Sequence, residues 1–118
     1  MNIRLLVNGT VIHTSLDDSA AARDFFALLP LSLTLTDYAG TEKIAYLDTQ
    51  LSTAGLPAGT AANTGDICYY APWGNLAFFY RDFGYARGLI KLGRLPGDCA
   101  WLTDAKDIEL VIEKEALN

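Results

Sequence analysis

The chain has 118 residues, of which 51% are hydrophobic and 19% charged, so it has the length of one domain and is too apolar to be disordered. Its formal net charge is −5 and its nine lysines and arginines are scattered, whereas nucleic acids and anionic membranes bind clustered basic side chains. We therefore expect neither a nucleic-acid nor a membrane partner.

The cysteines and the N-terminus indicate a cytoplasmic protein. Cys68 and Cys99 form no CxxC pair and there is one histidine, so we expect no metal site, no cofactor and two buried, reduced thiols. Spacing gives no Cα distance, so a disulfide stays open as the alternative. The first residues lack the basic and long apolar segments of a secretory signal, and no run is long enough to span a membrane.

The first segment predicts a β-hairpin. Asn8-Gly9 separates two strand-like runs, 2–7 and 10–14, and both residues tolerate the positive φ of a type I′ turn. A two-residue turn places His13 opposite Arg4 on the outer face, which argues against a catalytic or metal-binding role for the single histidine. The side chains expected on the core face are Ile3, Leu5 and Ile12.

A short helix and two strands are expected next. Residues 17–19 offer capping oxygens, residues 20–29 contain no glycine or proline, and Pro30 ends the helix. Residues 31–36 alternate apolar and hydroxyl side chains, which predicts a half-buried strand. A turn at 37–42 leads to a shorter strand at 43–47.

The second half of the chain predicts a long loop and then further strands. Residues 52–66 contain three glycines and a proline and are expected to form a loop. Residues 67–71 and 76–80 form a second hairpin around the turn at 72–75. Both faces of these strands are apolar, so we expect one to face a barrel interior and the other to be covered by a helix or loop.

The remaining elements complete a barrel. Residues 82–88 are expected to form an exposed loop, and 89–95 a strand with Gly93 at a bulge. A short element lies near 101–102, and the final strand covers 108–113. About eight short strands with one or two short helices predict a mostly β, closed or nearly closed barrel that forms a single domain over the whole chain.

Several motifs occur in a characteristic order along nearly the whole chain. They are Leu28-Leu29-Pro30-Leu31, Asp37-Tyr38 with Glu42-Lys43, Gly65-Asp66-Ile67, Tyr70-Ala71-Pro72-Trp73-Gly74-Asn75, Phe79-Tyr80-Arg81-Asp82-Phe83-Gly84-Tyr85 and Leu92-Gly93-Arg94-Leu95. In this order they resemble the bacterial cyclophilin-like fold family of uncharacterised proteins. The resemblance implies a small barrel of the cyclophilin type and implies no particular activity.

The resemblance does not extend to the prolyl isomerases of the cyclophilin class. Those enzymes carry a Phe-x-Arg strand followed by Gln-Gly-Gly-Asp, and here the only glutamine is Gln50, in a different context. No catalytic residue is therefore carried over, and we expect a binding protein rather than an enzyme. Weak prolyl isomerase activity is the first alternative, and a non-catalytic interaction module, such as a homodimer, is the second.

Aromatic side chains concentrate in residues 69–85. Alternate members fill the barrel, but Trp73 lies in a turn, and Phe83 and Tyr85 lie in a glycine-bounded loop. Exposed aromatic groups are covered by the loop 52–66, by a second subunit or by a ligand, and the sequence leaves these three open. We expect a pocket at one end of the barrel that takes a small molecule or an extended peptide. Its candidate residues are Tyr38, Glu42, Tyr70, Trp73, Phe79, Tyr80, Tyr85 and Arg87.

Two charged candidates each have two interpretations. Glu42 lies in a solvated turn or forms a surface ion pair with Lys43, or it is a carboxylate at the pocket rim that reaches Arg87 or Arg94. Arg87 stacks on the aromatic loop or binds a carboxylate with two hydrogen bonds, or it caps a cluster of carbonyl groups or pairs with Asp82.

Overall fold

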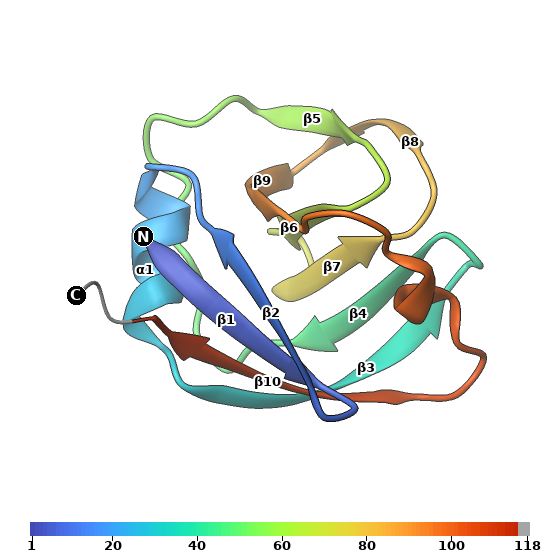
Figure 1. Cartoon of the computed structure of the whole chain (residues 1–118). Coiled ribbons are helices and arrows are strands. Elements are labelled where there is room, and N and C mark those ends of the chain that lie inside the picture. Colours follow the sequence, from blue (N-terminus) through green and yellow to red (C-terminus); the bar gives the residue numbers. More distant parts are fainter. Residues whose placement is uncertain (116–118) are drawn as a thin grey trace.

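The computed structural model describes residues 1–115, which form ten strands, one α-helix and one 3₁₀ helix (Figure 1). The strands are β1 (Asn2–Val7), β2 (Thr10–Ser15), β3 (Leu31–Tyr38), β4 (Glu42–Tyr46), β5 (Gly59–Ala62), β6 (Asp66–Tyr70), β7 (Asn75–Phe79), β8 (Phe83–Arg87), β9 (Leu89–Arg94) and β10 (Ile108–Lys114). Eight of them form one antiparallel sheet in the order β2-β1-β10-β3-β4-β7-β6-β9, and β5 pairs with β8 in a separate sheet.

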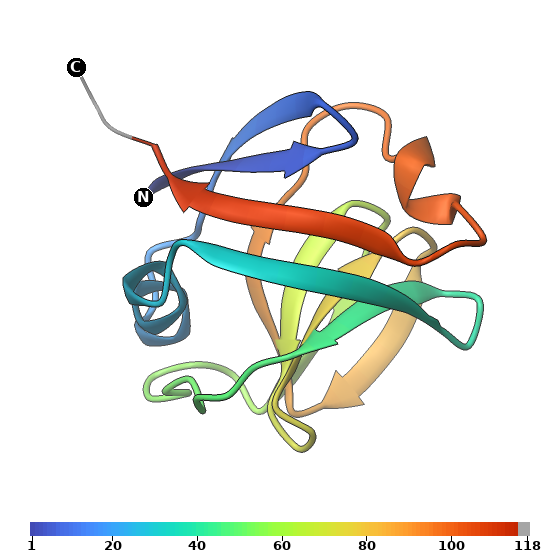
Figure 2. The ribbon, with the colours of Figure 1, turned by 90° about the horizontal axis from the view of Figure 1, so that it is seen from below.

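The eight-stranded sheet curls into a nearly closed barrel (Figure 2), which confirms the predicted fold class. Its two edges meet at a single bridge between Leu16 and Gly93, supported by a hydrogen bond of 2.7 Å from the Asp17 amide to the Leu92 carbonyl. A Cβ on Gly93 would lie 2.8 Å from the Ser15 carbonyl oxygen, so this close approach requires glycine. The bulge expected at this glycine is confirmed by a register shift between β6 and β9.

The first predicted hairpin forms as expected, whereas both strands of the second begin one residue earlier than predicted and the helix ends two residues earlier. In the first hairpin Val7 pairs with Thr10 and Arg4 with His13, as the two-residue turn requires. The helix α1 (Ala20–Ala27) lies at one end of the barrel (Figures 1 and 2), and its first turn is capped by Ser19, whose hydroxyl accepts from the Ala22 amide at 3.1 Å. The 3₁₀ helix η1 (Ala100–Thr103) precedes β10.

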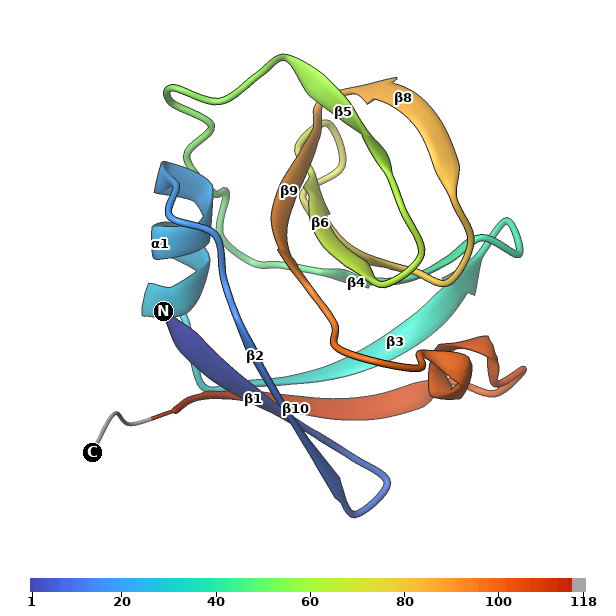
Figure 3. The same ribbon diagram turned by 45° about the horizontal axis from the view of Figure 1, so that its top comes forward.

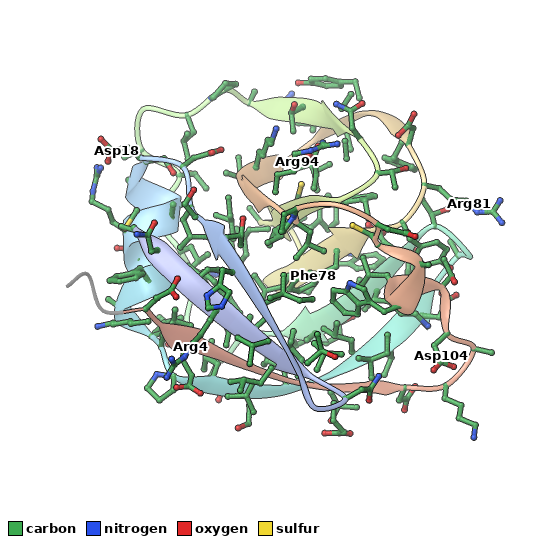
Figure 4. The ribbon with its side chains drawn as sticks, in the orientation of Figure 1. Arg4, Asp18, Phe78, Arg81, Arg94 and Asp104 are labelled. Carbon is green, nitrogen blue, oxygen red and sulfur yellow. The ribbon has the colours of Figure 1, made fainter. Side chains whose placement is uncertain are left out.

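The barrel interior holds the main hydrophobic core, with Phe78 near its centre (Figure 4). Because successive strand residues point to opposite faces, the neighbours of Phe78 on β7 point away from this core. We call the side of β4, β7, β6 and β9 that faces away from the barrel interior the outer face. It carries most of a second buried cluster, which comprises Ile44, Cys68, Ala77, Phe79 and Leu89 together with Ala62 from β5. Both faces of the 67–71 and 76–80 strands are therefore covered, as expected.

Two segments that we expected to be loops, 52–66 and 82–88, instead contribute strands that cover the outer face. Within residues 52–66 and 82–88 the chain forms β5 and β8, which pair antiparallel and lie outside the barrel near β9 (Figure 3). We call this pair the cover sheet. The residues of β5 are small, β8 has no regular apolar alternation, and each strand depends on a partner far along the chain, so neither strand has a local signal. Similarly, the turn predicted at 37–42 is shorter, because β3 reaches Tyr38 and β4 begins at Glu42.

Both cysteines are free and buried, as expected for reduced thiols. Cys68 belongs to the outer-face cluster, whereas Cys99 belongs to the barrel core. Of the helices described, neither combines the length and apolar character needed to cross a bilayer.

The close approach of the two cover-sheet strands generates a prediction. A Cβ on Gly59 would lie 2.3 Å from the Ala86 carbonyl oxygen, whereas a Cβ on Gly84 would meet nothing within 4 Å. Gly59→Ala should therefore lower the free energy of unfolding by about 1–3 kcal/mol and increase amide exchange in β5, while Gly84→Ala should change stability by less than about 0.5 kcal/mol. Denaturant unfolding and hydrogen exchange measure both, and equal effects of the two variants would contradict this account of the cover sheet.

Candidate functional site

A partly enclosed pocket of about 180 Å³ lies between the outer face and the cover sheet. It therefore lies on the side of the barrel, whereas we expected a pocket at one end of the barrel. Ten residues line it: Tyr38, Glu42, Ile44, Tyr70, Trp73, Asn75, Phe79, Phe83, Ala86 and Leu89. Eight of them come from the hairpins of the main sheet and from β9, and Phe83 and Ala86 come from β8.

The strand register brings these side chains to one surface. Glu42 on β4 lies directly opposite Tyr38 on β3 and Phe79 on β7. At the other end of the pocket, Tyr70 on β6 lies directly opposite Asn75 on β7 and Leu89 on β9. Directly opposite residues on one face have Cβ atoms about 5 Å apart, so each polar group has aromatic or aliphatic neighbours on both sides.

Aromatic rings form most of the pocket wall. The Trp73 ring packs edge-on against both Tyr38 and Tyr70, with centroid distances of 5.4 Å and interplanar angles of 81°. The Phe79 and Phe83 rings are 5.9 Å apart and tilted by 32°. Trp73 nevertheless keeps 49% of its surface exposed and Phe83 44%, so the rings are only partly covered by the chain itself. An exposed cluster of this kind is typical of an interaction site.

Glu42 is the one charged residue of the pocket lining. Burial of its carboxyl group among apolar neighbours raises its pKa from 4.5 to about 7. Within residues 1–115 it forms no salt bridge. Near neutral pH this carboxyl group is therefore divided between its charged and neutral forms.

Asn75 is the second polar group with unused bonding capacity. Its residue is 2% exposed, and its side-chain Nδ2 donates to the Leu76 carbonyl oxygen at 3.0 Å. Its Oδ1 atom has no hydrogen-bond partner in the part of the chain that the structure describes. Buried polar atoms without partners are rare in native proteins and cost about 1–3 kcal/mol, so this one suggests a missing donor.

Five of the eight candidate residues line the pocket and three do not. Tyr38, Glu42, Tyr70, Trp73 and Phe79 are brought together. Tyr80 instead donates a hydrogen bond of 2.5 Å to the Asp37 carboxylate, which lowers the pKa of Asp37. Tyr85 and Arg87 lie exposed on β8, outside the lining.

The structure also decides the ion pairs considered for Glu42 and Arg87. Lys43 points to the opposite side of β4 from Glu42, is 1% exposed, and donates to the Asp104 carbonyl oxygen at 2.6 Å. The surface ion pair between Glu42 and Lys43 is therefore absent, and Arg94 pairs with Asp66 at 3.0 Å instead of with Glu42. Successive residues of a strand point to opposite faces, which separates Glu42 from Lys43.

Arg87 has neither of the ionic partners proposed for it within residues 1–115. The Asp82 carboxylate accepts from the Thr64 amide at 2.8 Å and from its hydroxyl group, which lowers the pKa of Asp82. The backbone of Arg87 pairs with Gly59 across the cover sheet, and its side chain is exposed.

Sequence reasoning missed five lining residues: Ile44, Asn75, Phe83, Ala86 and Leu89. Asn75 was assigned to a turn, although its period-two spacing from Phe79 places both on one face of a strand. The chain also contains one half of the isomerase pattern that we expected to be absent, since Phe79-Tyr80-Arg81 reads Phe-x-Arg. Arg81 extends away from the barrel (Figure 4) and is outside the pocket lining. No group of three or more metal-binding side chains occurs within residues 1–115.

The raised pKa of Glu42 predicts how stability depends on pH. Between pH 4.5 and about 7 the unfolded chain loses the Glu42 proton while the folded protein keeps it, so this group lowers stability as pH rises. Glu42→Gln removes this loss. We expect it to leave the free energy of unfolding unchanged near pH 4 and to raise it by about 1–2 kcal/mol above pH 7, after allowance for solvent screening.

Denaturant unfolding of the wild type and Glu42→Gln across this pH range measures the effect. Glu109→Gln is the matched control, because Glu109 lies exposed on β10 and its carboxylate accepts from the Thr34 hydroxyl group at 3.0 Å. Parallel pH profiles for all three proteins would show that Glu42 titrates normally.

Comparison with known proteins gives the family. The model of the family described as "Cyclophilin-like family" matches residues 5–113. Among solved structures, the solution structure of a hypothetical protein from Archaeoglobus fulgidus matches with a TM-score of 0.72 at 16% identity, covering 98% of this chain and 95% of that chain; this likeness concerns the fold alone. No curated protein matches the sequence. Since the family match spans most of the barrel, the chain belongs to the Cyclophilin-like family.

Proposed function

We propose that the protein binds a small molecule in the pocket between the outer face and the cover sheet. The observation that carries this proposal is a pocket of about 180 Å³ in which aromatic rings surround one carboxyl group with a strongly raised pKa. Concave, mostly apolar sites with a few convergent polar groups are the usual form of ligand sites. Perturbed carboxyl groups in such a site are typical of function rather than of folding.

A comparison of the partners of two carboxyl groups, one outside the pocket and one inside it, supports this proposal. Asp66 is fully buried and has three partners: it accepts from Arg94 at 3.0 Å and from the Asn63 amide at 2.8 Å, and it lies 3.5 Å from the Lys91 ammonium group. In the pocket, the half-buried Glu42 carboxyl group has no salt-bridge partner within the described chain, although its partial burial disfavours the charged form. A ligand that supplies the missing interactions explains why this arrangement is present.

The other functions expected from the sequence stay predictions. An extended peptide fits the pocket only through a side chain, because the volume is that of a small fragment. A weak prolyl isomerase is not favoured by the pocket, since its lining contains no arginine to polarise a prolyl amide. Self-association is favoured by exposed aromatic rings outside the pocket, namely Tyr85 on the cover sheet, which is 66% exposed, and Tyr46 on β4, which is 62% exposed.

Filling the pocket from the cover sheet tests the proposal. Ala86 lines the pocket, whereas Ala61 is exposed on the neighbouring strand β5. We expect single-ring fragments, screened as neutral, cationic and anionic sets, to raise the melting temperature of the wild type and of Ala61→Phe. Ala86→Phe should abolish this shift, because the added ring occupies the space of the ligand.

The screen is scored by thermal unfolding, with the melting curve of each free variant as the check that it folds. If fragments of all three charge classes leave the melting temperature of the wild type unchanged, the small-molecule proposal fails. It also fails if Ala86→Phe binds the same fragments as strongly as Ala61→Phe does.

A further inference from the structure

We propose that the ligand of this pocket is a small organic ammonium ion, recognised by the Glu42 carboxylate and by the aromatic rings beside it. This inference rests on the proposed function and names the class of ligand. It is carried by the charge of the pocket, by the placement of its rings and by the hydrogen-bonding capacity that the fold leaves unused.

The charge of the lining is of one sign. Glu42 is its only ionisable group besides two tyrosines, and the lining contains no lysine, arginine or histidine. The basic residues next to the lining along the chain are outside it: Lys43 bonds to the Asp104 carbonyl oxygen on the opposite side of β4, and Arg81 extends away from the barrel (Figure 4). Arg87 follows Ala86 on β8, but its side chain is exposed and does not line the pocket. An anionic ligand would meet the carboxylate without a compensating cation, whereas a cation gains a direct partner.

The aromatic rings supply a second attraction for a cation. Tyr38 and Phe79 flank Glu42 on the adjacent strands, and the Trp73 ring packs against Tyr38 at 5.4 Å. Rings at nearly right angles form walls that face different directions, and the negative faces of aromatic rings attract ammonium groups. A carboxylate beside such walls selects for positive charge more strongly than an apolar pocket of the same volume.

The polar atoms of the pocket accept hydrogen bonds and are short of donors. The Glu42 carboxylate has no salt-bridge partner within residues 1–115, and the Oδ1 atom of Asn75, which is 2% exposed, has no hydrogen-bond partner there. Glu42 and Asn75 lie near opposite ends of the pocket. Asn75 is the first residue of β7, whereas Glu42 lies opposite Phe79, the last residue of β7. An elongated cation with a donor group at each end satisfies both.

Burial is the cause of the raised pKa of Glu42. The other titratable or charged residues on β3, β4, β6, β8, β9 and the connection between β7 and β8 are Asp37, Tyr38, Lys43, Tyr46, Asp66, Cys68, Tyr69, Tyr70, Tyr80, Arg81, Asp82, Tyr85, Arg87, Lys91 and Arg94. Asp37 is engaged by Tyr80, and Lys91 lies 3.5 Å from Asp66. Burial raises the pKa values of Cys68 and Glu42, so Glu42 is the group of the lining that changes charge near neutral pH.

A pair of probes that differ only in charge tests the proposal. Choline is a permanent cation, and 3,3-dimethyl-1-butanol has the same shape with carbon in place of nitrogen. Binding is followed by the NMR shift of the Trp73 indole N–H, assigned with Trp73→Phe. At about pH 8 we expect choline to bind at least about tenfold more tightly than its neutral analogue. At about pH 5.5 the preference should shrink, because choline keeps its charge while Glu42 becomes neutral.

The variants separate the role of Glu42 from general electrostatics. Glu42→Gln should remove most of the preference for choline at about pH 8 and its pH dependence, and leave binding of the neutral analogue unchanged. Glu109→Gln changes the net charge equally but lies on β10, outside the pocket, and should behave as the wild type does. Benzylamine and benzyl alcohol form a second pair, in which the cation also carries N–H donors.

The outcomes distinguish this inference from the proposed function. Equal binding of cation and neutral analogue in both pairs, or a preference that Glu42→Gln leaves intact, would overturn the ammonium ligand and leave small-molecule binding standing. The same holds if neither cation moves the Trp73 resonance while a neutral or anionic fragment from the screen does. If no probe and no fragment binds, both proposals fail together.

Discussion

Burial of the outer face is the constraint on which the rest of the structure depends. The barrel fills its own interior, but Ile44, Phe79 and Leu89 point outward from the same strands and need a second cover. The chain provides it with β5 and β8, anchored by the hydrogen bond from the Gly88 amide to the Ala58 carbonyl oxygen at 2.7 Å. Two short strands do not cover four completely, and the partly enclosed pocket lies between the outer face and β8.

Charged groups inside and outside the pocket differ in whether the chain supplies them with a partner. Buried charges outside the pocket have ionic partners within the chain. Asp66 pairs with Arg94 and Lys91, and Lys43 lies 3.6 Å from the Asp37 carboxylate and also donates to the Asp104 carbonyl oxygen. In the pocket, Glu42 is left with apolar neighbours and a raised pKa. A protein that folds with such a group retains a stability cost in its free form, and this cost is removed when a ligand supplies the partner.

Part of the pocket lining could be predicted from the sequence, because the alternation of side chains along a strand is a local pattern. The density of aromatic residues in 69–85 identified Tyr70, Trp73 and Phe79, because hairpin strands keep their alternation when they join the sheet. The pattern did not separate Phe83, which lines the pocket, from Tyr85, which does not. That difference depends on how β8 meets β5, where a register shift lies between Thr60 and Ala62.

The sequence by itself determined the elements whose cause is local. The Asn8-Gly9 turn specifies the first hairpin and its register, Pro30 ends the helix, and strict alternation marks β3, because turn geometry, proline and the period of two act over a few residues. Tertiary structure alone decided the closure of the barrel at the Leu16–Gly93 bridge, the cover sheet, and the presence of Phe83 rather than Tyr85 in the pocket lining. Each of these depends on contact between strands far apart in the chain, and no local pattern records such contacts.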